Sequence, residues 1–173
     1  MRRNLFPLLC CLLAAGCATP PDPGRGPLGA PASLPAISFP ADALITQRAV
    51  LTALGRQYPL NGYLALSAAA GRRLIVTGTV GAVLADVLVK PDGTVFVMRS
   101  SKQFRPKWIQ RYIAGDLMCI FGSAPDAACP MQRLSENHFM IKRRWYKLDL
   151  QIVETKSGPQ PAEMFDETEK GTH

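Results

Sequence analysis

Apolar positions alternate most clearly in the middle of the chain. Between residues 82 and 100, two apolar runs flank Pro91-Asp92-Gly93. This pattern predicts a hairpin with a type I turn, in which Gly93 is left-handed and forms a bulge. The expected register places Leu88 opposite Phe96.

Both faces of this hairpin are largely apolar. In the expected register Asp86 lies opposite Met98, and its carboxylate would pair with Arg99 or Lys102. One face carries Leu84, Leu88, Phe96 and Met98, and the other carries Val83, Val87, Val89, Val95 and Val97. Such a hairpin needs an apolar neighbour on each side.

A helical spacing of apolar residues follows the hairpin. It predicts a helix from Arg105 to about Phe121, with Pro106 in the first turn and Gly122 just past the end. The apolar stripe of this helix consists of Trp108, Ile109, Tyr112, Ile113, Leu117, Ile120 and Phe121.

The other segments have shorter patterns. A short helix is expected from about Asp42 to Gln57, with Ala43, Leu44, Val50, Leu51 and Leu54 apolar, followed by strands near 62–69 and 73–80. A last hairpin turns either near 135–137 or at Arg143-Arg144. From Tyr146 to Ile152 apolar and polar residues alternate, which is typical of a sheet with one solvated face.

These elements predict an α+β fold: an antiparallel β-sheet, or a half-open barrel, with one long helix packed on it. Residues 41–158 form the single expected domain. Residues 159–173 contain two prolines, three glutamates and one aspartate, and are predicted to be a disordered tail.

The first residues of the chain predict an export signal. Residues 1–16 have two arginines, an apolar run from Leu5 to Leu13 and small residues at the end, as in a signal peptide. The run is too short to span a bilayer. Leu13-Ala14-Ala15-Gly16-Cys17 resembles the bacterial lipobox, which implies that Cys17 receives a diacylglyceryl group and acyl chains such as palmitate. The alternative is an ordinary signal peptide that contains a cysteine.

Residues 17–40 then form a tether between lipid and domain. Seven prolines occur between residues 18 and 40, with glycines among them. Such a segment is extended and solvated, and it could hold the domain a few tens of Å from the membrane. Ala18 is not an aspartate, the residue that retains lipoproteins at the inner membrane, so we expect an outer-membrane protein whose domain faces the periplasm.

The net charge limits the classes of partner that the chain can bind, and the cysteine count leaves one possible disulfide. The net charge is +7, and removal of the leader leaves 18 basic and 13 acidic residues. Export excludes nucleic acid, so anionic headgroups are the available acidic surfaces. Cys119 and Cys129 are left as a pair in an oxidising compartment. They form either a disulfide or two unrelated thiols, with Cys119 in the core.

No catalytic or metal-binding motif is present. The chain lacks a G-x-S-x-G elbow, a P-loop, an H-E-x-x-H and a C-x-x-C motif. His138 and the terminal His173 are the only histidines, and His138 is interpreted as a surface residue. We therefore expect no enzyme, no cofactor and no metal; a small hydrolase is the least favoured function.

Two sets of residues are candidate sites. Soft and aromatic side chains could line a pocket for acyl chains or form a plain core: Leu84, Leu88, Phe96, Met98, Trp108 and Tyr112. A basic run could contact headgroups or a protein partner, or form the solvated face of a strand: Lys142, Arg143, Arg144, Trp145 and Lys147.

The order of segments resembles a known class. This order is similar to that of short outer-membrane lipoproteins related to the lipoprotein receptor LolB. It consists of a lipobox, a proline tether, strands, the hairpin GAVLADVLVKPDGTVFVMRSS, the helix WIQRYIAGDLMCIFG and a final hairpin. A family often encoded beside aryl-polyene or fatty-acid-type biosynthesis genes shares this order. The resemblance covers roughly residues 60–155 and implies a half-open barrel whose apolar concave face receives acyl chains beneath a helical lid.

Two functions follow as expectations. The first is an outer-membrane lipoprotein that binds or transfers a lipid or a lipid-like apolar ligand non-covalently. The second is a non-enzymatic accessory subunit of a cell-envelope complex, with an envelope protein as its partner.

Overall fold

The structure, a computed structural model, describes residues 38–122 and 129–167. The predicted signal peptide, the predicted lipid attachment at Cys17, the predicted tether up to residue 37 and residues 168–173 lie outside the described residues. Within the described ranges, no helix has the length and apolar character needed to cross a membrane.

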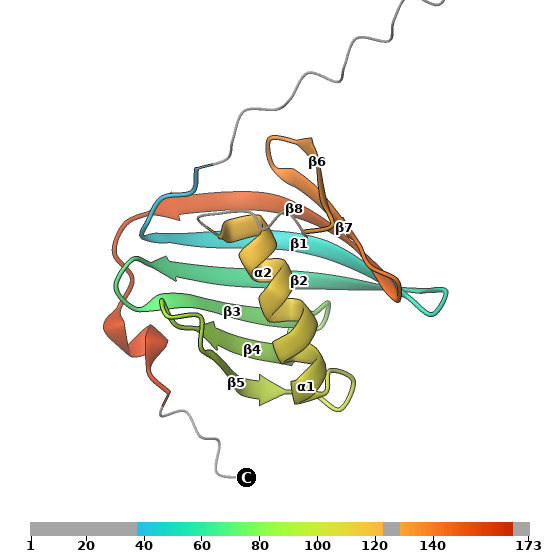
Figure 1. Cartoon of the computed structure of the whole chain (residues 1–173), viewed down its shortest axis with the longest axis horizontal. Helices are drawn as coiled ribbons and strands as arrows, with labels where there is room; N and C mark the ends of the chain where they lie inside the picture. Colours follow the sequence, from blue (N-terminus) through green and yellow to red (C-terminus); the bar gives the residue numbers. More distant parts are fainter. Residues whose placement is uncertain (1–37, 123–128, 168–173) are drawn as a thin grey trace, which may run out of the picture. The chain divides into compact units, whose positions relative to one another are not determined.

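Eight strands form one antiparallel sheet (Figure 1). Its order is β5-β4-β3-β2-β1-β8-β7-β6, so the first strand lies in the middle and pairs with both the second and the last. The antiparallel sheet of the expected fold is therefore confirmed. The strands are β1 (Ala43–Ala53), β2 (Arg56–Ser67), β3 (Gly71–Gly78), β4 (Val83–Val89), β5 (Val95–Ser100), β6 (Met131–Ser135), β7 (His138–Lys142) and β8 (Tyr146–Ser157).

The predicted helix over 42–57 is wrong, because this segment forms β1 and the start of β2. Apolar residues in β1 also alternate with a period of two: Ala43, Ile45 and Leu51 are buried on one face. Hydrogen-bonded neighbours on both sides then stabilise the extended backbone. Leu54 lies in the turn between β1 and β2 with a φ of 52°.

The β4–β5 hairpin agrees with its prediction in the turn and in part of the register. Gly93 has a φ of 86°, and Leu88 pairs with Phe96. Asp86, however, lies opposite Arg99 and not Met98, because the register shifts between Asp86 and Val87. A bulge of one residue cannot be read from alternation alone.

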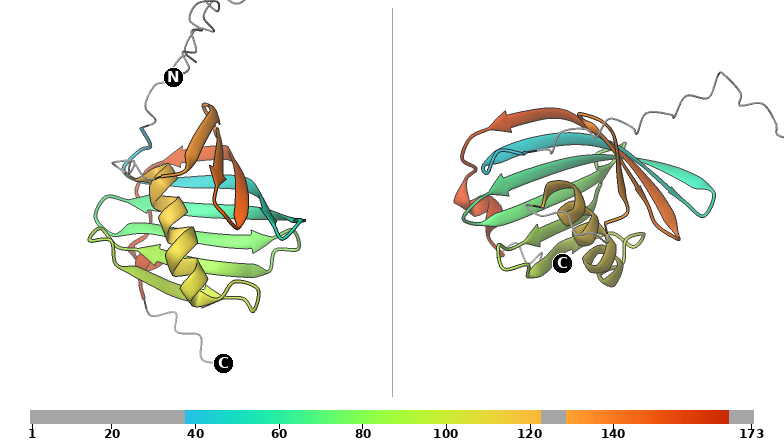
Figure 2. Two further views of the ribbon diagram at one scale, coloured as in Figure 1. Left: turned by 45° about the vertical axis from the view of Figure 1, so that its right-hand side comes forward. Right: turned by 45° about the horizontal axis from the view of Figure 1, so that its top comes forward.

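The helical segment has the bounds expected for it, but it is not one long α-helix. It consists of α1 (Pro106–Trp108), a π-helical turn (Ile109–Ile113) and α2 (Ala114–Phe121), of 3, 5 and 8 residues. Pro106 occupies its first turn as predicted. The segment lies across one face of the sheet (Figures 1 and 2).

Both turns considered for the last hairpin are formed. One joins β6 to β7 after Ser135, and the other joins β7 to β8 through residues 143–145, so the three strands make a meander. The predicted alternation of β8 is confirmed: Tyr146, Leu150 and Ile152 are buried, while Gln151 is exposed.

Apolar clusters occupy both faces of the sheet. The larger includes Val87 and Val89 of β4 together with Ile109 and Leu117 of the helical segment. Leu88, whose side chain points to the opposite face, belongs to a smaller cluster. The buried members of that cluster are Ala65, Leu88 and Phe165, and its partly buried members are Leu44, Ala70, Phe96, Met98 and Met164.

The predicted disordered tail is wrong for residues 159–167. Ala162–Phe165 form a 3₁₀ helix, and Phe165 is 3% exposed. Arg73 Nη1 donates to the carbonyl of Met164 at 2.7 Å, and Lys90 lies 3.3 Å from the carboxylate of Glu167. Prolines and acidic residues suggest a frayed end, but the Met164-Phe165 pair provides an apolar anchor.

Candidate functional site

A small cavity lies between the sheet and the helical segment. Its volume is about 70 Å³, and strands β1, β2, β3 and β8 contribute to its walls. Most lining residues are apolar, among them Leu51, Leu60, Val76, Trp108, Leu117 and Leu150. This space is well below the size of a pocket for a whole drug-sized molecule, so it can receive only part of a ligand.

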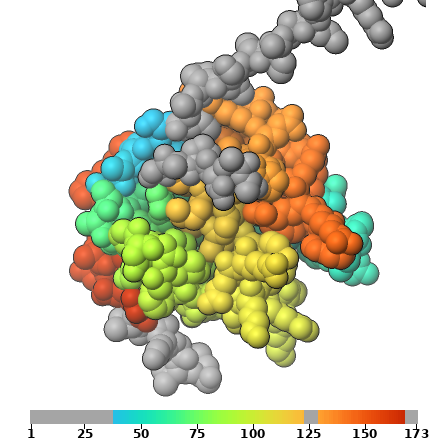
Figure 3. Space-filling view, viewed as in Figure 1, coloured from blue at the N-terminus to red at the C-terminus, as the bar shows by residue number. Residues whose placement is uncertain are grey.

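A larger groove, of about 870 Å³, lies at one end of the sheet. It is lined by the β1–β2, β3–β4 and β7–β8 turns and by the connection from β5 to α1. Each of these turns presents an exposed apolar side chain: Leu54 is 93% exposed, Val80 89% and Trp145 61%. Figures 1 and 3 show the β1–β2 and β7–β8 turns at the same edge of the molecule. Exposed apolar side chains on three separate turns therefore line one groove.

The cavity and the groove are neighbours. Leu51, Leu60, Phe104, Trp108 and Tyr146 line both. Trp108 is the centre of an aromatic cluster, with ring centroids 5.4 Å from Phe104 and 5.6 Å from Tyr146. The cavity and the groove therefore share these side chains in their walls.

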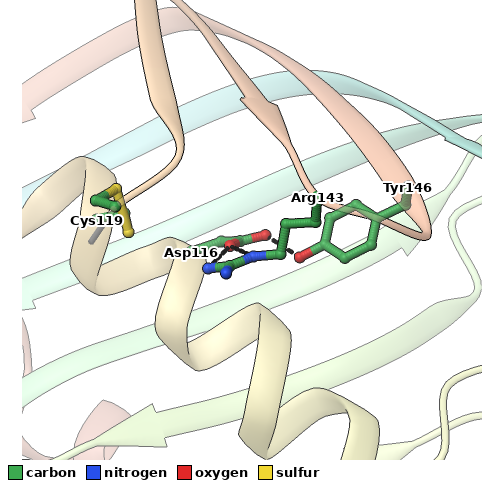
Figure 4. The surroundings of a disulfide bond; sticks show 5 residues. Asp116, Cys119, Arg143 and Tyr146 are labelled. Carbon is green, nitrogen blue, oxygen red and sulfur yellow. Dashed lines mark hydrogen bonds and ion pairs between the residues drawn. A yellow bond between two sulfur atoms is a disulfide. The ribbon is translucent and has the colours of Figure 1, made fainter.

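A buried carboxylate adjoins the cavity. Asp116 on α2 is 5% exposed, and its Oδ1 accepts hydrogen bonds from Arg143 Nε at 2.9 Å and Nη2 at 2.7 Å (Figure 4). Its Oδ2 accepts a hydrogen bond from the hydroxyl of Tyr146. These contacts join the helical segment to the β7–β8 turn.

Burial and hydrogen-bond partners shift the pKa of this carboxyl group in opposite directions. Desolvation raises the pKa of Asp116, although the hydrogen bonds from Tyr146 and Arg143 and the charge of Arg143 act to lower it. Burial, followed by the hydrogen bond to Asp116, also raises the pKa of Tyr146. The hydroxyl of Tyr146 therefore keeps its proton at neutral pH and can donate a hydrogen bond.

Two buried side-chain oxygens have no hydrogen-bond partner among the described residues. One is Gln47 Oε1, which adjoins the cavity, and the other is Ser101 Oγ, which adjoins the groove. Native proteins pair most buried polar atoms, so each of these needs an explanation.

The structure does not bring the predicted apolar site residues together. Leu84, Trp108 and Tyr112 pack against the larger cluster, whereas Leu88, Phe96 and Met98 belong to the smaller one on the opposite face. Leu84 is separated from Leu88 because it is the extra residue of a bulge, in which Val76 pairs with Ala85 and Thr77 with Val83.

The predicted basic run is also divided. Arg143 binds the buried Asp116, and the Tyr146 side chain between the basic residues is buried. Arg144 lies 4.7 Å from the centroid of the Trp145 ring, and Lys147 lies 3.8 Å from the carboxylate of Asp149. Lys142 is exposed at the end of β7. Within this run, Trp145 is exposed and lines the groove, and Arg144 next to it in the chain is exposed as well.

Sequence reasoning missed Gln47 and Asp116. Each is a polar residue at an inward position of an apolar pattern: Gln47 between Ile45 and Ala49 of β1, and Asp116 between Ile113 and Ile120 of the helical segment. Both could have been identified as polar residues at positions where the repeat of apolar residues predicts a buried side chain.

The structure joins Cys119 and Cys129 in a disulfide, with their Cα atoms 5.7 Å apart. Of the two alternatives for this pair, the bridge is the one formed. It connects α2 to the chain just before β6.

His138 lies on the outer part of the sheet, with its side chain 35% exposed. Its Nε2 is 2.6 Å from Asp149 Oδ1. Among residues 38–122 and 129–167, no group of three or more histidine, cysteine or acidic side chains could hold a metal ion.

Comparison of the chain with protein-family models gives no match, and no curated protein matches it.

Proposed function

We propose that this protein is an outer-membrane lipoprotein that binds or transfers an apolar, lipid-like ligand without covalent chemistry. The observation that carries the proposal is the adjacency of the apolar groove and the cavity beneath the helical segment. A ligand chain would lie mainly in the groove, and its inner end would enter the cavity. Burial of its CH₂ groups would contribute about 0.8 kcal/mol each.

In this proposal the sheet acts as a half-open barrel and the helical segment as its lid. Trp108 would move aside to admit the chain, because it lines both spaces. The π-helical turn that follows Trp108 supports such a role, since π-helical turns are frequent at functional sites. This arrangement is the one expected from the resemblance to the LolB-related lipoproteins.

The open end of the groove would exchange its ligand at a membrane surface. Leu54, Val80 and Trp145 would enter the interface, where tryptophan is favoured. Lys102 and Arg105 line the groove and are exposed, so they would bind anionic headgroups, as would Arg144. A lipid anchor on Cys17 would hold the domain at the outer membrane, on the periplasmic side.

The first experiment is a native mass spectrum of the full chain, released from detergent micelles in the gas phase. We expect an added mass of lipid size on the wild-type protein. Ala49→Leu, at a wall of the cavity, would reduce this adduct, because the larger side chain occupies part of the apolar space.

The matched control is Phe96→Ala combined with Met98→Ala, in the smaller cluster on the opposite face. This variant should lower the unfolding midpoint and leave the adduct unchanged. A stable wild-type protein without an adduct, or an Ala49→Leu protein that binds as much lipid as wild type, would refute ligand binding in the cavity.

The exposed tips also favour a second candidate, a non-enzymatic accessory subunit of an envelope complex. A partner's apolar segment would then occupy the groove, with Trp145 at the contact. Trp145→Ser would release such a partner from cross-linked membranes, whereas Val153→Ser, at an exposed site of β8, would not. Retention of every cross-link by Trp145→Ser would rule this candidate out.

A further inference from the structure

Gln47 is a polar side chain held inside an apolar wall. It is 4% exposed and lines the cavity, and its Oε1 has no hydrogen-bond partner among the described residues. The pairing of β1 with β8 shifts by one residue between Thr46 and Gln47. Bulges of this kind are frequent beside functional sites, where they re-aim side chains.

The neighbouring strand leaves room for this amide. A Cβ atom on Gly62 of β2 would lie 2.6 Å from both Cγ and Nε2 of Gln47, so any side chain at position 62 would collide with it. Gly62 is also the residue that pairs with Gln47 across the β1–β2 ladder. The fold therefore accommodates a buried glutamine at a position where leucine or valine would serve the core.

Neighbouring protein groups do not satisfy Gln47. Asp116 and Tyr146 line the same cavity, but they form a hydrogen bond with each other, and Asp116 also accepts hydrogen bonds from Arg143. A stable buried water needs two to four polar partners, and this wall is mainly apolar. An unpaired buried amide is costly to the folded protein, which points to a partner that arrives with the ligand.

We propose that Gln47 determines specificity, by accepting a hydrogen bond from a hydroxyl group on the part of the ligand that enters the cavity. The ligand class is then a hydroxylated apolar chain. Because Lys102 and Arg105 line the outer groove, an acidic head would stay there and the hydroxyl would lie toward the far end of the chain. This inference rests on the proposed ligand binding.

The test is a competition on the full chain. An equimolar mixture of 16-hydroxyhexadecanoic acid and hexadecanoic acid is added to the protein in detergent, and native mass spectrometry gives the ratio of the two adducts. We expect wild type to favour the hydroxylated acid about fivefold, the effect of one hydrogen bond that would otherwise be unmade. Gln47→Leu should reduce the ratio to about one or less and raise the unfolding midpoint, because it removes an unpaired buried amide.

Gln132→Leu is the matched control, since Gln132 is exposed in β6, and it should keep the wild-type ratio. Equal adducts on wild type, or the same preference in wild type and Gln47→Leu, would overturn the role of Gln47 and leave ligand binding standing. Absence of both adducts from wild type would overturn both proposals.

Discussion

Tyr146, the first residue of β8, donates its hydroxyl hydrogen to Asp116 on α2 inside the protein. This hydrogen bond joins the last strand to the helical segment that covers the cavity (Figure 4). Its acceptor is a buried carboxylate, and hydrogen bonds to charged groups contribute more than those between neutral groups.

Tyr146→Phe should therefore lower the free energy of unfolding by about 2 kcal/mol, because the ring is kept while Asp116 loses a donor. Urea unfolding of the full chain measures the change. Tyr63→Phe, at a tyrosine that is 44% exposed, should change stability by less than about 0.5 kcal/mol. Equal effects of the two substitutions would show that the hydrogen bond to Asp116 contributes little.

The titration of Asp116 should make stability depend on pH. A carboxyl group whose pKa is raised by folding binds its proton more tightly in the folded state. Its contribution to stability is then fully present below the unfolded pKa, near 3.8, and is lost as the pH rises through the folded pKa. The free energy of unfolding of wild type should thus fall relative to Asp116→Asn as the pH rises from 3.8.

Unfolding curves of both proteins over that pH range give this difference. A difference that is constant, or that grows in favour of wild type with rising pH, would show that the carboxyl pKa is not raised by burial.

Arg73 and Asp86 form a buried ion pair between β3 and β4. Arg73 Nε and Nη2 donate to the two carboxylate oxygens at 3.0 and 2.7 Å. Asp86→Ala should lower the free energy of unfolding by about 3 to 5 kcal/mol, because it removes a buried carboxylate that accepts two hydrogen bonds from the buried guanidinium of Arg73. Arg99→Ala, which removes the exposed cation opposite Asp86, should cost less than about 0.5 kcal/mol. If Arg99→Ala lowered the free energy of unfolding more than Asp86→Ala did, Arg99 would be the main ion-pair partner of Asp86.

Phe165 should anchor the 3₁₀ helix on the smaller cluster. Phe165→Ala is expected to cost about 3 kcal/mol, as for other buried aromatic residues, and to speed hydrogen exchange at Met164 and Phe165. Glu163→Ala, at an exposed position of the same helix, should leave both quantities near wild type. Wild-type exchange rates in the Phe165→Ala protein would mean that Phe165 does not anchor this segment.

The disulfide should stabilise the protein by restricting the unfolded chain. Closing a loop of 10 residues is worth about 3 kcal/mol in the chain-entropy model. The double variant Cys119→Ala and Cys129→Ala should lose about this amount, and reductant should destabilise wild type only. If reductant destabilised the double variant as much as wild type, the loss of stability would not come from this disulfide.

The hairpin around Gly93 and the alternation of β8 were predictable, because local turn chemistry and a two-residue period determine them. The first strand was not. Its inward residues Ala43 and Leu51 fit a helical and an extended spacing. Pairing with β2 and with β8, which lies far along the chain, decides between them. Long-range pairing overrides a short local pattern.

The candidate site was predictable only in part. The apolar stripe of the helix predicts Trp108 as a site residue, and Trp108 lines both the cavity and the groove. Leu84 and Leu88 were assigned to one face, but a bulge separates them. Arg143 was assigned to the surface because the sequence does not show that Asp116 lies across from it.

The pairing of β1 with β8 also constrains how the protein is made. Ala43 pairs with Ser157 and Ala53 with Tyr146, so the central strand has one unpaired edge until the end of the chain has been synthesised. Such distant contacts slow folding, and an open strand edge can pair with another chain in the meantime. Biogenesis should therefore depend on a holding chaperone, and chains that stop before β8 should aggregate instead of forming a partial sheet.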